Sequence, residues 1–177
     1  MMRRPNTVFR RVSVADAHAV AVVRVRSWQA AYAGLLPAPF LEAMDVEINA
    51  AKFRERLSSA TPLSEDWLLE VDGVVVGWAN CLSMTRDPDG EASVSEIAAI
   101  YLVPSVWGQG LGLSMLTCLV DGLAEAGTRV VTLWVLESNQ RARRFYERQG
   151  FVPDGLTKEV SIVEGVVLNE VRYRRAL

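Results

Sequence analysis

The sequence predicts an α/β fold in which a mixed, twisted β-sheet carries helices on both faces. Residues 97–151 alternate between strand-like apolar runs and helix-like apolar stripes, with a glycine turn after the first strand. Outside this stretch, short apolar segments meet at tight turns such as Asp72-Gly73, a dipeptide typical of β-hairpins. The resulting order of elements is β-α-α-β-β-β-α-β-α-β-β, which a sheet of mixed strand directions accommodates.

The N-terminal third is predicted to contain one strand and two helices. Residues 7–12 have the pattern of a strand, and Ser13 with Asp16 has the spacing of a capping box at a helix start. The first helix is expected over residues 14–33 and the second over residues 40–57. A glycine and a proline lie between them and break the helical pattern.

The rest of the chain is predicted to contribute six strands and two helices. Gly127 and Gly150 stand where these helices are expected to end, because glycine is favoured just after a helix C-terminus. A turn is expected at residues 87–90. Of the two helices in this part, one is expected to begin at Gly112 and the other after Asn139. The strands are expected at residues 66–71, 74–82, 97–103, 130–135, 156–163 and 166–174.

Composition favours a single cytoplasmic domain spanning residues 1–177. The chain is 50% hydrophobic, which is enough for one core. Its net charge of −2 lacks the excess of basic residues that is typical of nucleic-acid-binding proteins. No apolar run is long enough to span a membrane, and no apolar region of a secretory signal follows the basic N-terminus. Cys81 and Cys118 lie far apart, as expected of reduced core thiols in the cytosol.

The glycine turn has the features of an anion site. It reads Trp-Gly-Gln-Gly-Leu-Gly from Trp107 to Gly112 and opens a helix. Backbone N–H groups at a helix start favour negative charge, and glycines let a phosphate approach the main chain closely. The spacing fits neither the nucleoside-triphosphate loop nor the dinucleotide fingerprint. The turn alone therefore leaves two interpretations open, a pyrophosphate site or a tight strand-to-helix connection.

A second motif, N-x-x-A-x-x-F-Y-x-x-x-G-F, runs from Asn139 to Phe151. Together with V-P-x-x-W-G-Q-G-L-G before it, this motif resembles the GCN5-related N-acetyltransferase (GNAT) family, over about residues 74–173. The resemblance implies that acetyl-CoA is the co-substrate and that the glycine turn holds its pyrophosphate. The residues matched to that role are Trp107, Gly108, Gln109, Gly110, Leu111 and Gly112. The family usually has Arg or Gln where Trp107 stands, so a changed contact is expected there, with Gln109 and backbone amides still donating.

Acetyl transfer to an amine requires a neutral amine, although an alkyl ammonium has a pKa of about 10.4 in water. It also requires a donor for the oxyanion and a proton for the departing thiolate. The resemblance makes Glu96 the candidate base and Tyr146 the candidate acid. The alternatives are that Glu96 is a solvent-facing residue or an arginine partner, and that Tyr146 is a core residue beside Phe145.

The resemblance also assigns main-chain groups to the cofactor. In the family the fourth and fifth strands diverge, and the pantetheine arm pairs with the ladder groups left free. Ile100, Tyr101 and Leu102 are the matched positions, with the thioester carbonyl near their amides. Asn139 is expected either to contact the cofactor arm or to cap the following helix, since Asn is a preferred cap. Two interpretations stay open for the four arginines of that helix: all of them lie on a solvated face, or one of them reaches a CoA phosphate. The four are Arg141, Arg143, Arg144 and Arg148.

Trp28 and Tyr32 belong to an aromatic cluster that forms either helix–helix core or a wall of the acceptor site. The function expected is direct attack of a primary amine on acetyl-CoA in a ternary complex, with a small-molecule acceptor favoured over a protein N-terminus. The rival is a non-catalytic acyl-CoA-binding or regulatory module, supported by Trp107. His18 is the only histidine and lacks a companion ligand, so no metal is expected. Dimers through the last strands are common in the family, so a homodimer stays open.

Overall fold

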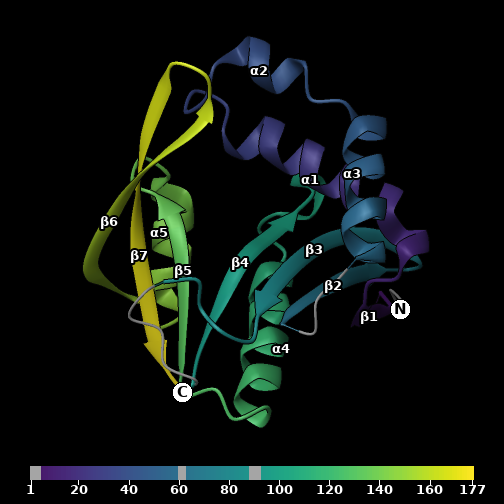
Figure 1. Cartoon of the computed structure of the whole chain (residues 1–177). Helices are drawn as coiled ribbons and strands as arrows, with labels where there is room; N and C mark the ends of the chain where they lie inside the picture. Colours follow the sequence, from purple (N-terminus) through teal and green to yellow (C-terminus); the bar gives the residue numbers. More distant parts are fainter. Residues whose placement is uncertain (1–4, 60–62, 88–92) are drawn as a thin grey trace.

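The computed structural model describes residues 5–59, 63–87 and 93–177. One seven-stranded mixed sheet has the order β1-β2-β3-β4-β5-β7-β6 (Figure 1). The predicted α/β class, with its mixed sheet, is confirmed. The strands are β1 (Thr7–Arg11), β2 (Ser64–Val71), β3 (Val74–Leu82), β4 (Val94–Leu102), β5 (Val130–Leu136), β6 (Val152–Val163) and β7 (Val166–Ala176). The helices are η1 (Val14–Asp16), α1 (Ala17–Ala31), α2 (Ala38–Glu42), α3 (Val46–Ser58), η2 (Pro104–Val106), α4 (Leu111–Glu125) and α5 (Gln140–Arg148).

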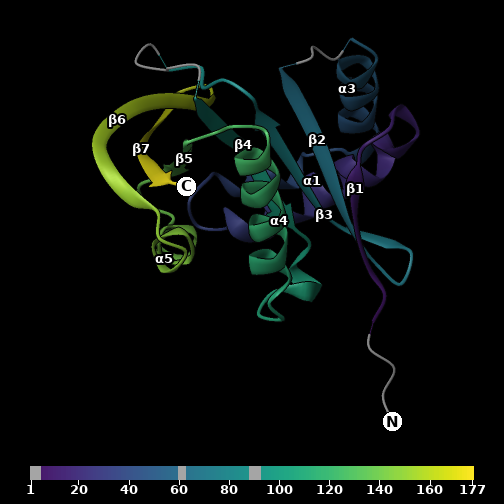
Figure 2. The same cartoon turned by 90° about the horizontal axis from the view of Figure 1, so that it is seen from below.

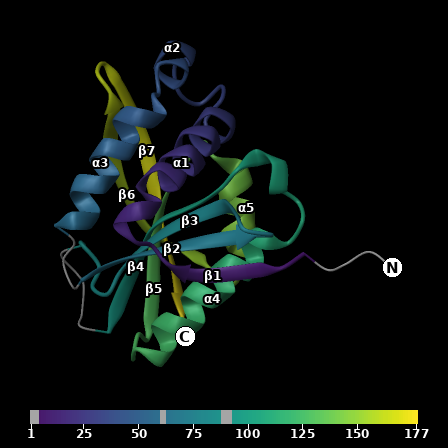
Figure 3. The same ribbon diagram turned by 90° about the vertical axis from the view of Figure 1, so that its right-hand side faces the viewer.

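The helices form a layer on each side of the sheet. Helices α1 and α3 cover one face (Figure 3). On this face Phe53 of α3 packs edge-on against Trp78 of β3 at a centroid distance of 5.0 Å. Helix α4 covers the opposite face, and its Met115 lies against Gly77, the neighbour of Trp78 in β3. Strands β6 and β7 curl away at the end of the sheet farthest from β1 (Figure 2). Successive side chains of β3 point to opposite faces of the sheet, so this strand contributes to the core on both sides.

The predicted second helix is in fact two helices, and this part of the prediction was wrong. Asp45 has extended backbone angles and caps α3 by accepting a hydrogen bond from the N–H of Ile48 at 2.7 Å. That cap starts a new helix and leaves α2 as a separate short one. The capping box of Ser13 and Asp16 is confirmed, with Ser13 N donating to Asp16 Oδ2 at 2.8 Å, although it opens η1 before α1. The turn predicted at residues 87–90 falls largely outside the described residues.

Strands β4 and β5 pair over a short distance and then separate. Their parallel ladder joins Val94–Glu96 to Val130–Thr132. Directly after it, Ile97 and Ala99 face consecutive residues of β3, so Ala98 is an extra residue in β4. Such a bulge bends a strand and increases its local twist. Beyond the bulge β4 follows β3 while β5 follows β7, and a wedge opens between the two strands.

The two cysteines lie in different environments, which corrects the expectation that both are core residues. Cys81 in β3 is buried, and burial raises the pKa of its thiol to about 12. Cys118 is exposed on α4, and both thiols are free. None of the described helices is both long enough and apolar enough to cross a membrane.

Gly77 is expected to be required for the packing of α4 on the sheet. A Cβ at this position would lie 3.1 Å from both Leu69 Cβ and Met115 Sδ, so Gly77→Ala is expected to cost about 1–3 kcal/mol of the free energy of unfolding through overpacking. Urea denaturation measures this loss. Gly122→Ala on α4 is the control, because no described atom lies within 4 Å of its added Cβ and alanine favours helix. Equal stability of the two variants would contradict this account.

Candidate active site

The wedge between β4 and β5 holds a cavity of about 580 Å³. Its walls come from both strands, the end of α1, the glycine turn and α5. Most of the residues predicted for the site line this cavity: Tyr32, Glu96, Ile100, Tyr101, Leu102, Trp107, Gly108, Gly110, Gly112, Asn139 and Tyr146. Trp28, Gln109 and Leu111 are not in its walls. Strand separation thus brings together residues that are 114 positions apart at the extremes, from Tyr32 to Tyr146.

The glycine turn presents the start of α4 to the cavity. Gly108 and Gly110 have φ angles of 78° and 81°, which side chains rarely adopt. Gly110 is the N-cap of α4 and provides no side-chain cap, so the first N–H groups of the helix have no such acceptor. A Cβ at either glycine would meet no described atom within 4 Å. This open cradle of N–H groups at a helix start fits an anion such as a phosphate.

Trp107 has a defined role at the edge of this cradle. Its indole N–H donates to the carbonyl oxygen of Leu102 at 2.7 Å, which ties the turn to the end of β4. Its ring stacks under the guanidinium of Arg141, 3.7 Å from the ring centroid. Arg141 lines the cavity and makes no ion pair with any residue in the described ranges. Gln109, expected to donate to the ligand, donates from Nε2 to Ser105 O at 3.0 Å and does not line the cavity.

The backbone of β4 offers hydrogen-bonding groups to the wedge. Val103 N donates to Val76 O of β3, at 2.9 Å. Because neighbouring residues of a strand point their backbone groups to opposite edges, Ile100 and Leu102 direct theirs toward the wedge and Tyr101 directs its own toward β3. Leu102 O already accepts from Trp107 and from Ser27 Oγ, at 2.9 Å in the latter case. Among the described residues, the backbone N–H and C=O of Ile100 and the N–H of Leu102 are therefore left for a ligand on this edge.

Tyr146 enters the cavity from α5. It is 9% exposed and packs edge-on against Phe145 and Phe151, at centroid distances of 5.3 and 5.9 Å. Burial raises the pKa of its phenol above the usual value, so the hydroxyl keeps its proton at neutral pH. No residue in the described part of the chain hydrogen-bonds that hydroxyl, which leaves it able to donate to a ligand. Asn139 Oδ1 caps α5 through Ala142 N at 3.1 Å while also lining the cavity.

Glu96 is a buried carboxylate, 1% exposed, in the cavity wall beside the apex of the wedge. Arg86 engages both of its oxygens. The guanidinium reaches them through Nη2 and through Nε at 3.2 Å, and the backbone N of Arg86 donates to Oε2 at 3.2 Å. This pair raises the pKa of the Arg86 guanidinium. Glu96 is thus both a cavity residue and an arginine partner.

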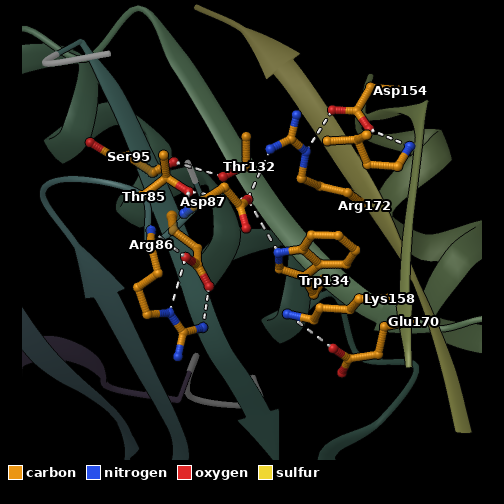
Figure 4. Close-up of polar contacts among 12 residues, drawn as sticks. Thr85, Arg86, Asp87, Ser95, Thr132, Trp134, Asp154, Lys158, Glu170 and Arg172 are labelled. Carbon is orange, nitrogen blue, oxygen red and sulfur yellow. Dashed lines mark hydrogen bonds and ion pairs between the residues drawn. The ribbon is translucent and has the colours of Figure 1, made fainter. Parts of the chain in front are cut away.

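A second charged network supports the segment that carries Arg86 (Figure 4). Arg172 of β7 lies between Asp87 and Asp154, with Nη1 and Nε at 2.9 and 2.7 Å from the two carboxylates. Trp134 of β5 donates from Nε1 to the same oxygen of Asp87 at 3.3 Å. Buried ion pairs hold their partners firmly, since breaking one leaves a charge uncompensated. The network therefore joins the segment after β3, through Asp87, to β5, β6 and β7.

The aromatic cluster forms the part of the cavity near α1. Tyr32 and Tyr101 bring their hydroxyl oxygens to 3.3 Å, and burial raises the pKa of both phenols. Trp28 stands behind the cavity wall and packs edge-on against Tyr32 at 4.9 Å. Arg24 stacks on the other side of Trp28, at 4.4 Å. Tyr32 thus faces the cavity, while Trp28 supports it from behind.

The sequence analysis missed three of the charged residues that line the cavity: Arg86, Lys158 and Glu170. Lys158 and Glu170 pair across the last hairpin because of a register shift between Ser161 and Val163, which the turn residues in the sequence do not indicate. Within residues 5–59, 63–87 and 93–177, no group of three His, Cys, Asp or Glu side chains could hold a metal ion.

Comparison with known proteins identifies the family. The sequence model of the Acetyltransferase (GNAT) family matches residues 25–151, which is well over half of the chain. The chain therefore belongs to this family, and it is an acyl-CoA-dependent N-acetyltransferase. Its cavity, glycine turn and divergent strands lie within the matched region, apart from the contribution of the last hairpin.

Individual relatives agree with this assignment. An uncharacterised N-acetyltransferase of Mycobacterium tuberculosis is 29% identical over 141 residues, covering 79% of this chain and 85% of its own. A GCN5-related N-acetyltransferase structure from Rhodopseudomonas palustris superposes with a TM-score of 0.74 at 22% identity, over 100% of this chain and 99% of that one. The PaiA N-acetyltransferase of Thermoplasma acidophilum, solved in complex with coenzyme A, gives 0.71 at 17% identity, over 97% and 99%.

Proposed function

We propose that residues 1–177 act as one catalytic domain that acetylates the primary amine of a small molecule by direct attack in a ternary complex. The observation that carries this proposal is the cavity in the wedge between β4 and β5. It is lined by Tyr146, whose hydroxyl has no hydrogen-bond partner among the described residues, and by Ile100, whose backbone groups face the wedge. The cavity of about 580 Å³ is in the range of small-ligand sites, and the aromatic wall at Tyr32, backed by Trp28, supports a small acceptor over a protein N-terminus.

The cofactor would be held mainly by the backbone. The N–H groups from Gly108 to Gly112 would bind the pyrophosphate of acetyl-CoA, and Arg141 would supply the cation that the turn itself lacks. Trp107 holds that guanidinium by stacking, so it replaces the usual Arg or Gln indirectly. Ile100 would pair with the amide-bearing pantetheine arm as a neighbouring strand would, because unpaired buried backbone groups are costly.

Acetyl-CoA supplies the acetyl group as an activated thioester. Tyr146 would act as the general acid: its raised pKa keeps the phenol protonated, and it can donate to the sulfur as the thiolate departs. Ile100 N–H would donate to the oxyanion. Asn139 remains committed to capping α5, and its position in the wall allows its amide to contact the cofactor arm as well.

Glu96 is the proposed acceptor of the proton that the amine loses. Both of its oxygens are engaged by Arg86, so the amine would have to take the place of one arginine contact to reach it. The Arg86 side chain is 63% exposed, so water would solvate its guanidinium where the amine displaces that contact. Tyr32, supported by Trp28, would form the apolar wall that positions the rest of the acceptor.

Tyr146→Phe is expected to lower kcat by roughly 100-fold, because general acid catalysis contributes at least that much in comparable enzymes. The measurement is thiol release from acetyl-CoA with a panel of small amines, alongside calorimetric titration of coenzyme A, whose Kd should hardly change. Tyr173→Phe is the matched control: its hydroxyl is bonded to Arg143 and Glu147 and lies outside the cavity. Unchanged turnover of Tyr146→Phe would refute the acid role.

The same panel separates the enzyme from a binding module. The wild-type chain is expected to transfer acetyl groups to at least one small amine. If it binds coenzyme A but releases no thiol with small amines or with peptides bearing a free N-terminus, then a non-catalytic acyl-CoA-binding module is the better description.

Arg141→Gln is expected to weaken coenzyme A binding about tenfold, since a charge-assisted hydrogen bond contributes roughly 1.5–3 kcal/mol. Calorimetry at two salt concentrations checks this, and the salt dependence should also become shallower. Arg144→Gln makes the same charge change on the same helix, at an exposed residue outside the cavity, and should leave Kd unchanged. Equal affinities of the two variants would rule out a phosphate contact by Arg141.

A further inference from the structure

Lysine is rare in this chain, and one of its lysines lies in the cavity. Its 19 basic residues comprise two lysines, Lys52 and Lys158, and 17 arginines. Lys52 is exposed on α3, whereas Lys158 of β6 lines the same cavity as Tyr146 and Ile100. A lysine side chain ends in a primary alkyl amine, the group that an N-acetyltransferase modifies, and a guanidinium cannot be deprotonated in proteins. Of the two lysines, Lys158 is therefore the one that shares a cavity with the proposed chemistry.

Two neighbours hold the Lys158 ammonium at the cavity wall (Figure 4). Its Nζ lies 3.3 Å from Glu170 Oε2 and 3.9 Å from the ring centroid of Trp134. Lys158 and Glu170 are direct partners in the β6–β7 ladder, so the carboxylate is fixed beside the amine by strand register. Trp134 and Glu170 line the cavity as well. An aromatic face with a carboxylate is a recurrent way to bind an alkyl ammonium.

The Lys158 side chain is not sealed into this position. It is 39% exposed, which is far more than the buried Arg172 network next to it, at 6%. Its contacts are an ion pair and a cation–π contact, each worth little at a partly exposed site. The four-carbon stem is flexible and carries its charge as a single terminal group. The amine can therefore leave Trp134 and move through the cavity toward the divergent part of β4.

We propose that Lys158 is a self-acetylation site, modified by acetyl-CoA bound to the same molecule. The proposal rests on the proposed function. Glu170 accepts a proton from the Lys158 ammonium, and the nitrogen lone pair then attacks the thioester carbonyl. A C–N bond forms and the C–S bond breaks, and the departing thiolate takes a proton from Tyr146 to become free thiol. The new amide nitrogen then loses its second proton, which returns to Tyr146. The products are N-acetyl-lysine at position 158 and coenzyme A, with one proton released overall.

Acetylation would change the charge of the part of the cavity that is lined by Lys158, Glu170 and Trp134. It removes the positive charge of Lys158 and with it the partner of Glu170. Glu170 would then face the cavity as an unpaired carboxylate, and the face of Trp134 would lose its cation. Both changes favour a cationic acceptor amine over an anionic one. The modification thereby sets which acceptors the cavity admits.

The test is mass spectrometry of the purified chain incubated with acetyl-CoA carrying a deuterated acetyl group, without added acceptor. Starting material is checked to be free of acetyl-lysine. Because the chain has two lysines, peptide mapping assigns each new acetyl group without ambiguity. Lys52 is the internal control for uncatalysed acetylation, and the variants are Lys158→Arg, Lys52→Arg and Tyr146→Phe.

We expect label at Lys158 at least about 100-fold faster than at Lys52, because a bound donor and a tethered amine react as if at high concentration. The first-order rate constant should not change with protein concentration. Lys52→Arg should leave this rate unchanged, Lys158→Arg should abolish single-site labelling, and Tyr146→Phe should slow it.

Equal labelling of Lys52 and Lys158 would overturn the inference, as would a rate that rises in proportion to protein concentration. A chain that acetylates an added amine but leaves Lys158 bare would overturn the inference while the proposed function stands. A chain that binds no coenzyme A would overturn the proposed function, and self-acetylation with it.

Discussion

The separation of β4 from β5 is the constraint on which the site depends. Their ladder joins Val94–Glu96 to Val130–Thr132, and the extra residue Ala98 then turns β4 away. One additional residue in one strand thus opens the cavity, frees the backbone of Ile100 and leaves room for Tyr146 to enter from α5. The buried network of Arg172, Asp87 and Asp154 fixes the strands on the far side of the opening, so the wedge is a stable feature of the fold.

Local signals explain which parts could be predicted. The glycine turn, the Tyr146 motif and the hairpin at Asp72-Gly73 each occupy a few consecutive residues whose backbone needs dictate the residue types, and the sequence analysis located all three. The break before α3 was missed because it depends on one side chain, Asp45, capping a helix in the middle of an otherwise helical pattern. Caps of this kind compete weakly with helix propensity in the sequence alone.

The charged part of the site could not be predicted because its contacts are non-local. Arg86 meets Glu96 across a loop, and Arg172 meets Asp87 from 85 positions away. The family resemblance made Glu96 a candidate base, and Arg172 fell within the strand expected at residues 166–174, but strand order decides their partners. The insertion of β7 between β5 and β6 is what brings Lys158, Glu170 and Trp134 to one cavity.

The short ladder at the apex has a mechanical consequence. The sheet has two parts, β1–β4 and β5–β7. Their strands are joined by the short β4–β5 ladder at Val94–Glu96 and Val130–Thr132. The pantetheine arm of bound acetyl-CoA, lying between β4 and β5, would link the two parts of the sheet. Cofactor binding would then raise the melting temperature and make both parts more rigid, since any ligand that binds only the folded chain stabilises it. Cellular supply of the acyl donor would in this way set how long each molecule resists unfolding.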